Sequence, residues 1–132
     1  MDIRFESPFE FKLEILETDD HVPSLRVSVR IIIEQFLHKF QYEGAFWIEC
    51  AVWDGFAQAL RNPSENNISL HDMSEHFMLS VKNTEQGILL EWKLDKPDID
   101  GKRHINVNFS SIIDEEMVAR IRQSFDDFPV WW

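Results

Sequence analysis

The chain has 132 residues, 44% of them hydrophobic, and a formal net charge of −11, because 24 acidic residues outnumber 13 basic ones. This length is typical of one domain that buries about two-thirds of its extended surface. The acidic excess repels polyanions, so we expect no nucleic-acid ligand; it either attracts a basic protein surface or serves only solubility. No segment approaches the roughly 20 apolar residues of a membrane span, and no signal peptide is evident, so we expect a soluble, cytoplasmic protein without membrane contact.

Regular alternation of apolar and polar residues predicts β-strands in the first third of the chain. Residues 8–17 form the first strand, and residues 25–33 form the second after a polar turn, so we expect the two to pair antiparallel. A third strand is expected over residues 40–47, where Gly44 suits a bulge or a close backbone approach.

The spacing then changes to that of a helix, which we predict over residues 48–62. Asn62-Pro63 ends this helix. The single cysteine, Cys50, lies on the apolar side of the helix, so we expect a buried thiol. Four apolar residues recur at every fourth position and therefore share one face: Ile48, Val52, Phe56 and Leu60.

Strands return in the second half, after a loop over residues 63–67. The segment 83–87, with glycine at its end, predicts a hairpin turn. In the last strand we expect Ile105, Val107 and Phe109 to face the core. The strands predicted by alternation in this half cover residues 68–70, 77–81, 88–94 and 104–109.

A second helix is predicted over residues 113–127, where apolar residues recur at intervals of three or four. Ser111 or Asp114 can cap its start, and Pro129 ends it. No internal repeat is evident. The order of elements predicts a single α+β domain over residues 1–132, with a mostly antiparallel sheet of about six or seven strands, a central helix and a C-terminal helix.

Residues with catalytic or metal-binding chemistry are sparse. His71, Asp72 and His76 lie close in sequence, but their spacing matches no standard metal motif. The glycines form no phosphate-binding loop, and no serine lies in a Gly-x-Ser-x-Gly setting. We therefore predict that the protein is not an enzyme and requires no cofactor or metal. The alternative is a small hydrolase or metal-dependent enzyme that uses these three residues.

Acidic loops and terminal aromatic residues are the candidate partner-binding elements. Charge speeds the encounter with a basic partner, whereas a few desolvated aromatic anchors supply most of the affinity. Either both terminal tryptophan rings fold back on the core, or one stays exposed as an anchor. The acidic candidates follow the first strand or precede the last one. Together with the two tryptophans, the candidate partner-binding residues are Glu17, Asp19, Asp20, Asp95, Asp98, Asp100, Trp131 and Trp132.

Several segments between residues 40 and 129 carry a family resemblance. They are a Gly44-Ala-Phe46 strand leading into Cys50-Ala-Val-Trp-Asp-Gly-Phe-Ala-Gln-Ala-Leu60, then Ile68-Ser-Leu-His-Asp-Met73, Phe77-Met-Leu-Ser-Val81, the Gly87 hairpin, and a last helix ending in Phe128-Pro129. This pattern resembles the WapI-like immunity proteins of bacterial polymorphic toxin and contact-dependent inhibition systems, which are small acidic cytoplasmic domains. The resemblance implies non-catalytic binding that blocks a cognate toxin domain, such as a basic nuclease. It implies no active-site residues, because such proteins act through binding surfaces that vary with the toxin.

Overall fold

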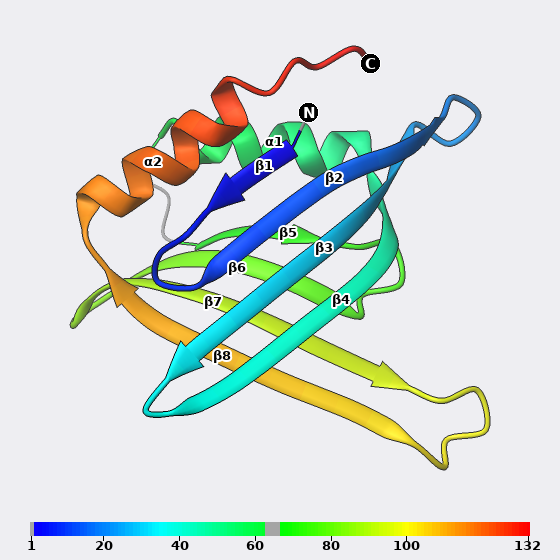
Figure 1. Ribbon diagram of the computed structural model, residues 1–132. Helices are drawn as coiled ribbons and strands as arrows, with labels where there is room; N and C mark the ends of the chain where they lie inside the picture. Colours follow the sequence, from blue (N-terminus) through cyan, green and yellow to red (C-terminus); the bar gives the residue numbers. More distant parts are fainter. Residues whose placement is uncertain (1, 63–66) are drawn as a thin grey trace.

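The computed structural model describes residues 2–62 and 67–132 as two four-stranded antiparallel sheets with two helices (Figure 1). The predicted loop over residues 63–67 lies outside the described residues except for Asn67, which begins β5. The first sheet has the order β1 (Asp2–Phe5), β2 (Glu10–Asp19), β3 (Ser24–Gln35), β4 (His38–Glu49), and α1 (Cys50–Leu60) follows it. The second has the order β5 (Asn67–His71), β6 (Phe77–Thr84), β7 (Gly87–Pro97), β8 (His104–Ile113), and α2 (Glu115–Asp126) follows it.

The predicted α+β class is confirmed, but the prediction of one sheet of six or seven strands is wrong. Each of the seven predicted strands overlaps an observed one. The additional strand is β1, which pairs antiparallel with β2 and buries Ile3 and Phe5. Alternation indicates which side chains face the core, but it does not tell which strands share a sheet.

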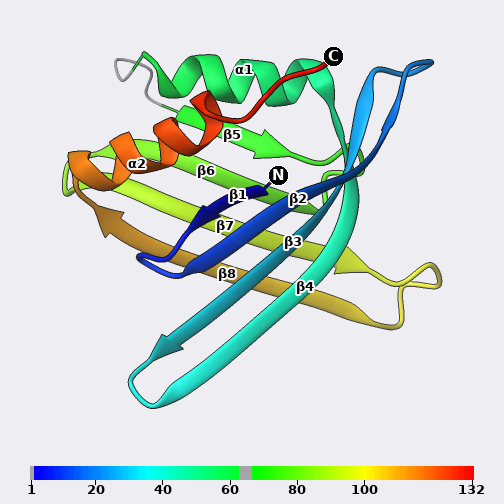
Figure 2. The same cartoon turned by 45° about the horizontal axis from the view of Figure 1, so that its top comes forward.

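Each helix follows one sheet and packs on the other. α1 continues from β4 and contacts β5, whereas α2 continues from β8 and contacts β1 (Figure 2). The two helices also meet, since Phe125 of α2 packs against Trp53 and Phe56 of α1 at ring-centroid distances of 5.1 and 5.0 Å. The order of four strands and a helix therefore occurs twice, and the crossed helices join both sheets to one hydrophobic cluster.

The helix boundaries differ by one or two residues from those predicted. α1 begins at Cys50, because Ile48 and Glu49 still pair with β3, and the Cys50 N–H donates to the Pro23 carbonyl at 2.9 Å. Ile48 is buried all the same. α2 begins after Asp114, whose carboxylate accepts from the Met117 N–H at 2.8 Å, so Asp114 is the N-cap.

Aromatic side chains fill the space between the sheets. Tyr42 and Phe46 of β4 stack on Phe77 of β6, with ring centroids 6.4 and 4.7 Å apart. Tyr42 also stacks on Trp92 of β7 at 5.9 Å. Phe56 and Trp92 are buried, as predicted.

Gly44 allows the close approach of a side chain rather than a bulge. The β3–β4 register runs through Gly44 without a shift, so the expected bulge is absent there. A Cβ atom at position 44 would overlap the Tyr42 hydroxyl. Glycine therefore lets the Tyr42 ring lie along its own strand.

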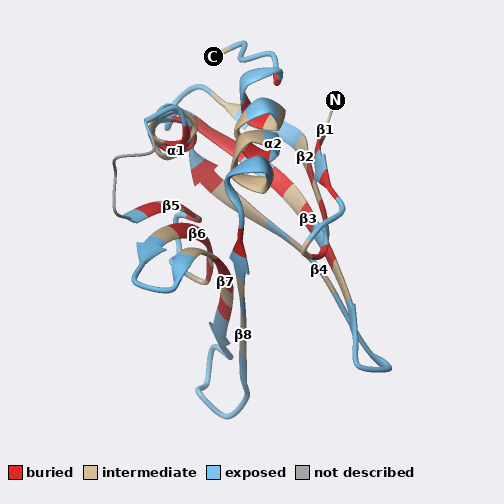
Figure 3. Cartoon of the chain, turned by 90° about the vertical axis from the view of Figure 1, so that its left-hand side faces the viewer, coloured by how far each residue is buried: buried red, intermediate tan, exposed pale blue. Residues whose placement is uncertain are grey.

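The strands extend beyond this shared core at one side of the molecule. In Figure 3 the β3–β4 and β7–β8 hairpins extend away from the helices, and their exposed tips end apart. Ile105 was expected to be in the core, but it is 56% exposed. It pairs with Lys96 near the end of the hairpin, where the first sheet no longer covers the inner face of β8.

Candidate functional site

The His71–His76 turn has a structural role in the described chain. Asp72 is buried, and its Oδ1 accepts from the backbone N–H groups of His76 and Phe77 at 2.7 and 2.8 Å. These two charge-assisted hydrogen bonds commit the carboxylate to the turn between β5 and β6. Among the described residues, no group of three or more His, Cys, Asp or Glu side chains is arranged to hold a metal ion.

Asp72 also affects the single tyrosine. Burial raises the pKa of Tyr42, and the negative charge of Asp72 raises it further. The phenol is thus held in its neutral form between the two sheets.

The predicted acidic residues of the β2–β3 turn lie beside the start of α1. Asp19 Oδ1 accepts from the His21 N–H at 2.8 Å, which fixes the turn, and Glu17 pairs with Arg26 at 3.4 Å. Asp20 is exposed and lies near Cys50: burial raises the pKa of this thiol, followed by the negative charges of Asp54 and Asp20. The turn therefore adds its charge to that of α1.

The terminal tryptophans reach the same part of α1. Trp132 Nε1 donates to Asp54 Oδ1 at 3.0 Å, and its ring meets Trp53 edge-on at 5.9 Å. Trp131 packs on Phe128 and Trp132 at 5.9 and 5.3 Å, yet it is 57% exposed. The Trp132 ring therefore folds back on α1, whereas the Trp131 ring stays exposed to solvent.

We call Asp20, Asp54, Trp131 and Trp132 the acidic–aromatic surface. Trp132 donates to Asp54 and packs on Trp131, and the charges of Asp54 and Asp20 both act on Cys50 at the start of α1. Sequence reasoning missed Asp54, because it is a single acidic residue that joins the tryptophans and the β2–β3 turn only through the fold.

The other predicted acidic loop lies elsewhere. Asp95, Asp98 and Asp100 belong to the β7–β8 hairpin, whose tip is distant from the β2–β3 turn in Figures 1 and 2. Asp95 pairs with His104, and the carboxylates of Asp98 and Asp100 accept from the backbone N–H groups of Ile99 and Lys102. The structure thus brings the first acidic loop and the tryptophans together and leaves the second loop apart.

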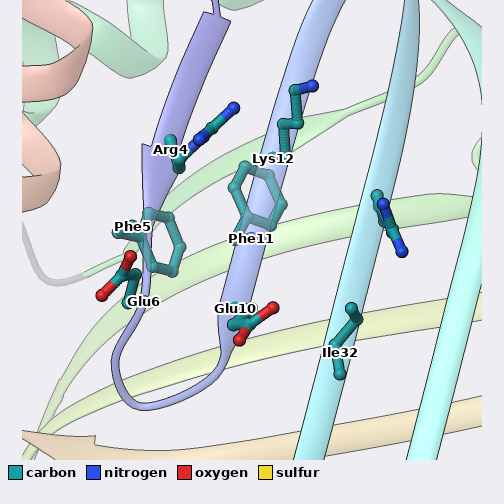
Figure 4. Close-up of a pocket in the computed structure, with 8 residues that line it drawn as sticks. Arg4, Phe5, Glu6, Glu10, Phe11, Lys12 and Ile32 are labelled. Atoms are coloured by element: carbon teal, nitrogen blue, oxygen red, sulfur yellow. The ribbon is translucent and has the colours of Figure 1, made fainter.

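A depression of about 270 Å³ lies on the outer face of the first sheet. Figure 4 shows Arg4 and Lys12 on neighbouring strands, with Glu6 and Glu10 at its other end. Arg4 and Lys12 both pair with Asp2, at 3.0 and 3.9 Å. These cations already have a carboxylate partner, so their charge in the depression is compensated.

The tip of the β3–β4 hairpin was not identified from the sequence. Phe36 and Leu37 form a two-residue turn in which both have positive φ, 53° and 67°. Both side chains are exposed, 83% for Phe36 and fully for Leu37. Such turns favour Asn-Gly, so two bulky apolar residues in this conformation cost stability without burying surface. Backbone strain of this kind is typical of functional segments.

Beside this tip an apolar cleft of about 370 Å³ lies between the two sheets. Its walls include Ile33, Phe36 and Phe40 of the hairpin and Val107 and Phe109 of β8. The cleft is the mouth of the space between the diverging sheets, and it is open to solvent.

No protein-family model, curated protein or solved structure matches this chain. No helix among the described residues is long and apolar enough to cross a membrane.

Proposed function

We propose that this protein is a cytoplasmic bacterial immunity protein that binds and neutralises a basic toxin domain, such as a nuclease, without catalysis. The resemblance of residues 40–129 to WapI-like immunity proteins is one support for this proposal. The net charge of −11 is the other, because an acidic protein attracts a basic partner and competes with the phosphates that a nuclease would bind.

The observation that carries the proposal is the exposed Trp131 ring, which packs on Trp132 next to α1. Trp132 holds the C-terminal segment against α1 through Asp54, so Trp131 is presented on a fixed support. Asp20, on the β2–β3 turn, adds negative charge near Cys50 at the start of the same helix. Tryptophan is enriched at the centres of protein interfaces, where it supplies affinity, whereas the surrounding charges mainly raise the association rate.

The experiment begins with the gene immediately upstream. If it encodes a toxin with a basic C-terminal domain, that domain is purified and its association with this protein is followed at low and high salt. Asp19→Lys/Asp20→Lys should slow association by about tenfold or more at low salt. The matched control is Asp98→Lys/Asp100→Lys, which makes the same charge change on the β7–β8 hairpin and should have a much smaller effect.

The aromatic contribution is tested separately by Trp131→Ala. Loss of a central tryptophan should raise the dissociation rate by about 10-fold or more and leave the association rate nearly unchanged. Ile99→Ala is the control, since Ile99 is a fully exposed apolar residue on the β7–β8 hairpin. A toxin domain that does not bind at all would overturn the proposed function. Binding unaffected by salt, by Asp19→Lys/Asp20→Lys and by Trp131→Ala would overturn the assignment of this surface.

A further inference from the structure

The outer edge of β4 carries backbone groups that no strand of the described chain pairs. β4 is the last strand of the first sheet and pairs only with β3. The Trp47 carbonyl points away from β3, because it accepts from the Met73 N–H at 2.8 Å. In an antiparallel strand every second residue directs its N–H and C=O to the same side. Lys39, Gln41, Glu43 and Ala45 therefore direct theirs to the open edge.

Among the edge strands of the described residues, β4 is the longest. β1 has 4 residues and contacts α2, and β5 has 5 residues and contacts α1, so two of the four sheet edges are short and covered. β4 has 12 residues, and its last open position is Ala45, because Met73 occupies the Trp47 carbonyl. A long open edge is a template for pairing with another strand.

The side chains along this edge are complementary to their own copy. If two β4 strands pair antiparallel about a two-fold axis at Gln41, Lys39 of each lies opposite Glu43 of the other. Within one chain, Glu43 already pairs with Arg30 and Lys39 with Glu34, both at 3.5 Å. Across the joined sheets, the charges in this row then alternate in sign. Arg30 and Glu43 of one copy are followed by Lys39 and Glu34 of the second copy. Opposite charges that face each other across strands stabilise a sheet, and like charges destabilise it.

The apolar residues fit the same register. Phe40 of each copy lies opposite Tyr42 of the other on the inner face, where Phe40 is partly exposed at the mouth of the cleft. Leu37, fully exposed at the strained tip, reaches the level of Ala45 in the other copy. The hairpin tip of one copy thus ends next to the Trp47 carbonyl of the other, where the hydrogen bond from Met73 closes the open edge. The pairing therefore uses the whole unpaired length of β4.

The charge distribution also permits contact between two copies here. Of the 24 acidic and 13 basic residues, residues 33–41 and 95–108 contain four of each, so this end of the molecule is neutral and the rest carries the entire charge of −11. Two copies therefore repel each other least at the end where Phe36, Leu37 and Phe40 are exposed.

From these observations we infer that the open edge of β4 pairs with the β4 edge of a second copy of this chain, about a two-fold axis at Gln41. The result is a continuous eight-stranded sheet across the dimer. The contact is isologous, so it closes after two copies and leaves no β4 edge for further growth. This inference does not depend on the proposed function.

The first test uses the purified protein alone, with the mass measured by sedimentation equilibrium over a series of concentrations. The wild type should approach twice the mass of the 15.7 kDa chain. Gln41→Pro removes the outward N–H at the axis, in an edge position where proline is tolerated, and should leave a monomer. Gln41→Thr keeps that N–H and is the matched control. Circular dichroism checks that each variant is folded.

The second test uses charge reversal and keeps every backbone group. Lys39→Glu places two acidic residues opposite each other at both ends of the contact, and Glu43→Lys places two basic ones there. Each variant alone should dimerise at least about tenfold more weakly than the wild type. Mixed together they should form a heterodimer that is at least about tenfold tighter than either variant alone, because both like-charged pairs across the contact become opposite pairs.

A wild-type chain that stays monomeric throughout the series overturns the inference. So does a dimer that survives Gln41→Pro and is indifferent to both charge reversals, since that dimer uses another surface. If Gln41→Pro does not fold, rescue in the mixture of the two charge variants decides the matter, because only antiparallel pairing in this register produces it.

Discussion

The strained tip of the β3–β4 hairpin makes a testable prediction about stability. Phe36 and Leu37 adopt positive φ and are exposed, so their side chains contribute little packing within one chain. We expect the double substitution Phe36→Asn/Leu37→Gly to stabilise the monomer, because asparagine and glycine adopt this turn readily.

The magnitude follows from the two backbone conformations. A left-handed conformation costs an L-residue about 1–2 kcal/mol, so the pair costs about 2–4 kcal/mol. The greater freedom of glycine in the unfolded chain cancels about 0.5–1 kcal/mol of the gain. The free energy of unfolding should therefore rise by about 1–3 kcal/mol.

Urea denaturation at low protein concentration measures this change. The control, Phe36→Ala/Leu37→Ala, removes the same apolar surface but keeps a Cβ atom at both positions, so its stability should stay within about 0.5 kcal/mol of the wild type. If the Asn-Gly variant is no more stable than the Ala-Ala variant, the turn stores no strain and the reasoning is refuted.

Two further predictions concern the core. Phe56→Ala should lower the free energy of unfolding by about 3–5 kcal/mol in urea denaturation, because the ring is buried against Phe125 of α2; a loss below about 1 kcal/mol would mean that the ring is not packed as described. Tyr42 is the single tyrosine, so the phenolate absorbance reports it alone, and its midpoint should lie above the ordinary value of 10.0, since burial and then Asp72 raise its pKa. Because the folded pKa exceeds the unfolded one, stability is retained below pH 10.0 and falls as the pH rises toward the folded pKa; Tyr42→Phe should reduce this loss, and a native midpoint at or below 10.0 would contradict it.

Local patterns predicted most elements of the fold but not their partners. Alternation predicted residues 25–33 and 88–94 as strands because inward side chains such as Val29 and Trp92 follow a period of two. The division into two sheets depends on the chain leaving the first sheet through α1, which then packs on β5. Contacts between residues far apart in the sequence determine which strands share a sheet. Local periodicity contains no information about such contacts.

Two particular failures have local causes. β1 contains four residues, too few for alternation to be distinctive, and it becomes a strand through pairing with β2. The turn at Phe36-Leu37 contains none of the glycine, proline or asparagine by which turns are recognised. It forms because β3 and β4 pair along 12 residues each, which compensates for an unfavourable turn.

The candidate surface was predicted only in part, for an equally physical reason. Asp20 and Trp132 are 112 positions apart in the sequence, and α1 joins them through Cys50 and Asp54. Asp98 and Asp100 resembled Asp19 and Asp20 in sequence, but the β7–β8 hairpin extends from the core at another end. Its residues 95–108 also contain as many basic as acidic residues. Charge in a loop is thus informative only after the direction of the loop is known.

The positions of the two proposed surfaces make their functions compatible. β4 begins at the hairpin tip with His38 and ends with Glu49 beside α1, and 12 residues of strand span roughly 35–40 Å. In the proposed dimer the hairpin of the second copy ends at the level of Ala45, before the strand reaches Glu49. The two acidic–aromatic surfaces would then lie at opposite ends of the paired strands, far enough apart for each to bind its own partner. Because the long-range field of the acidic ends persists in the dimer, self-association would leave the proposed capture of a basic partner intact.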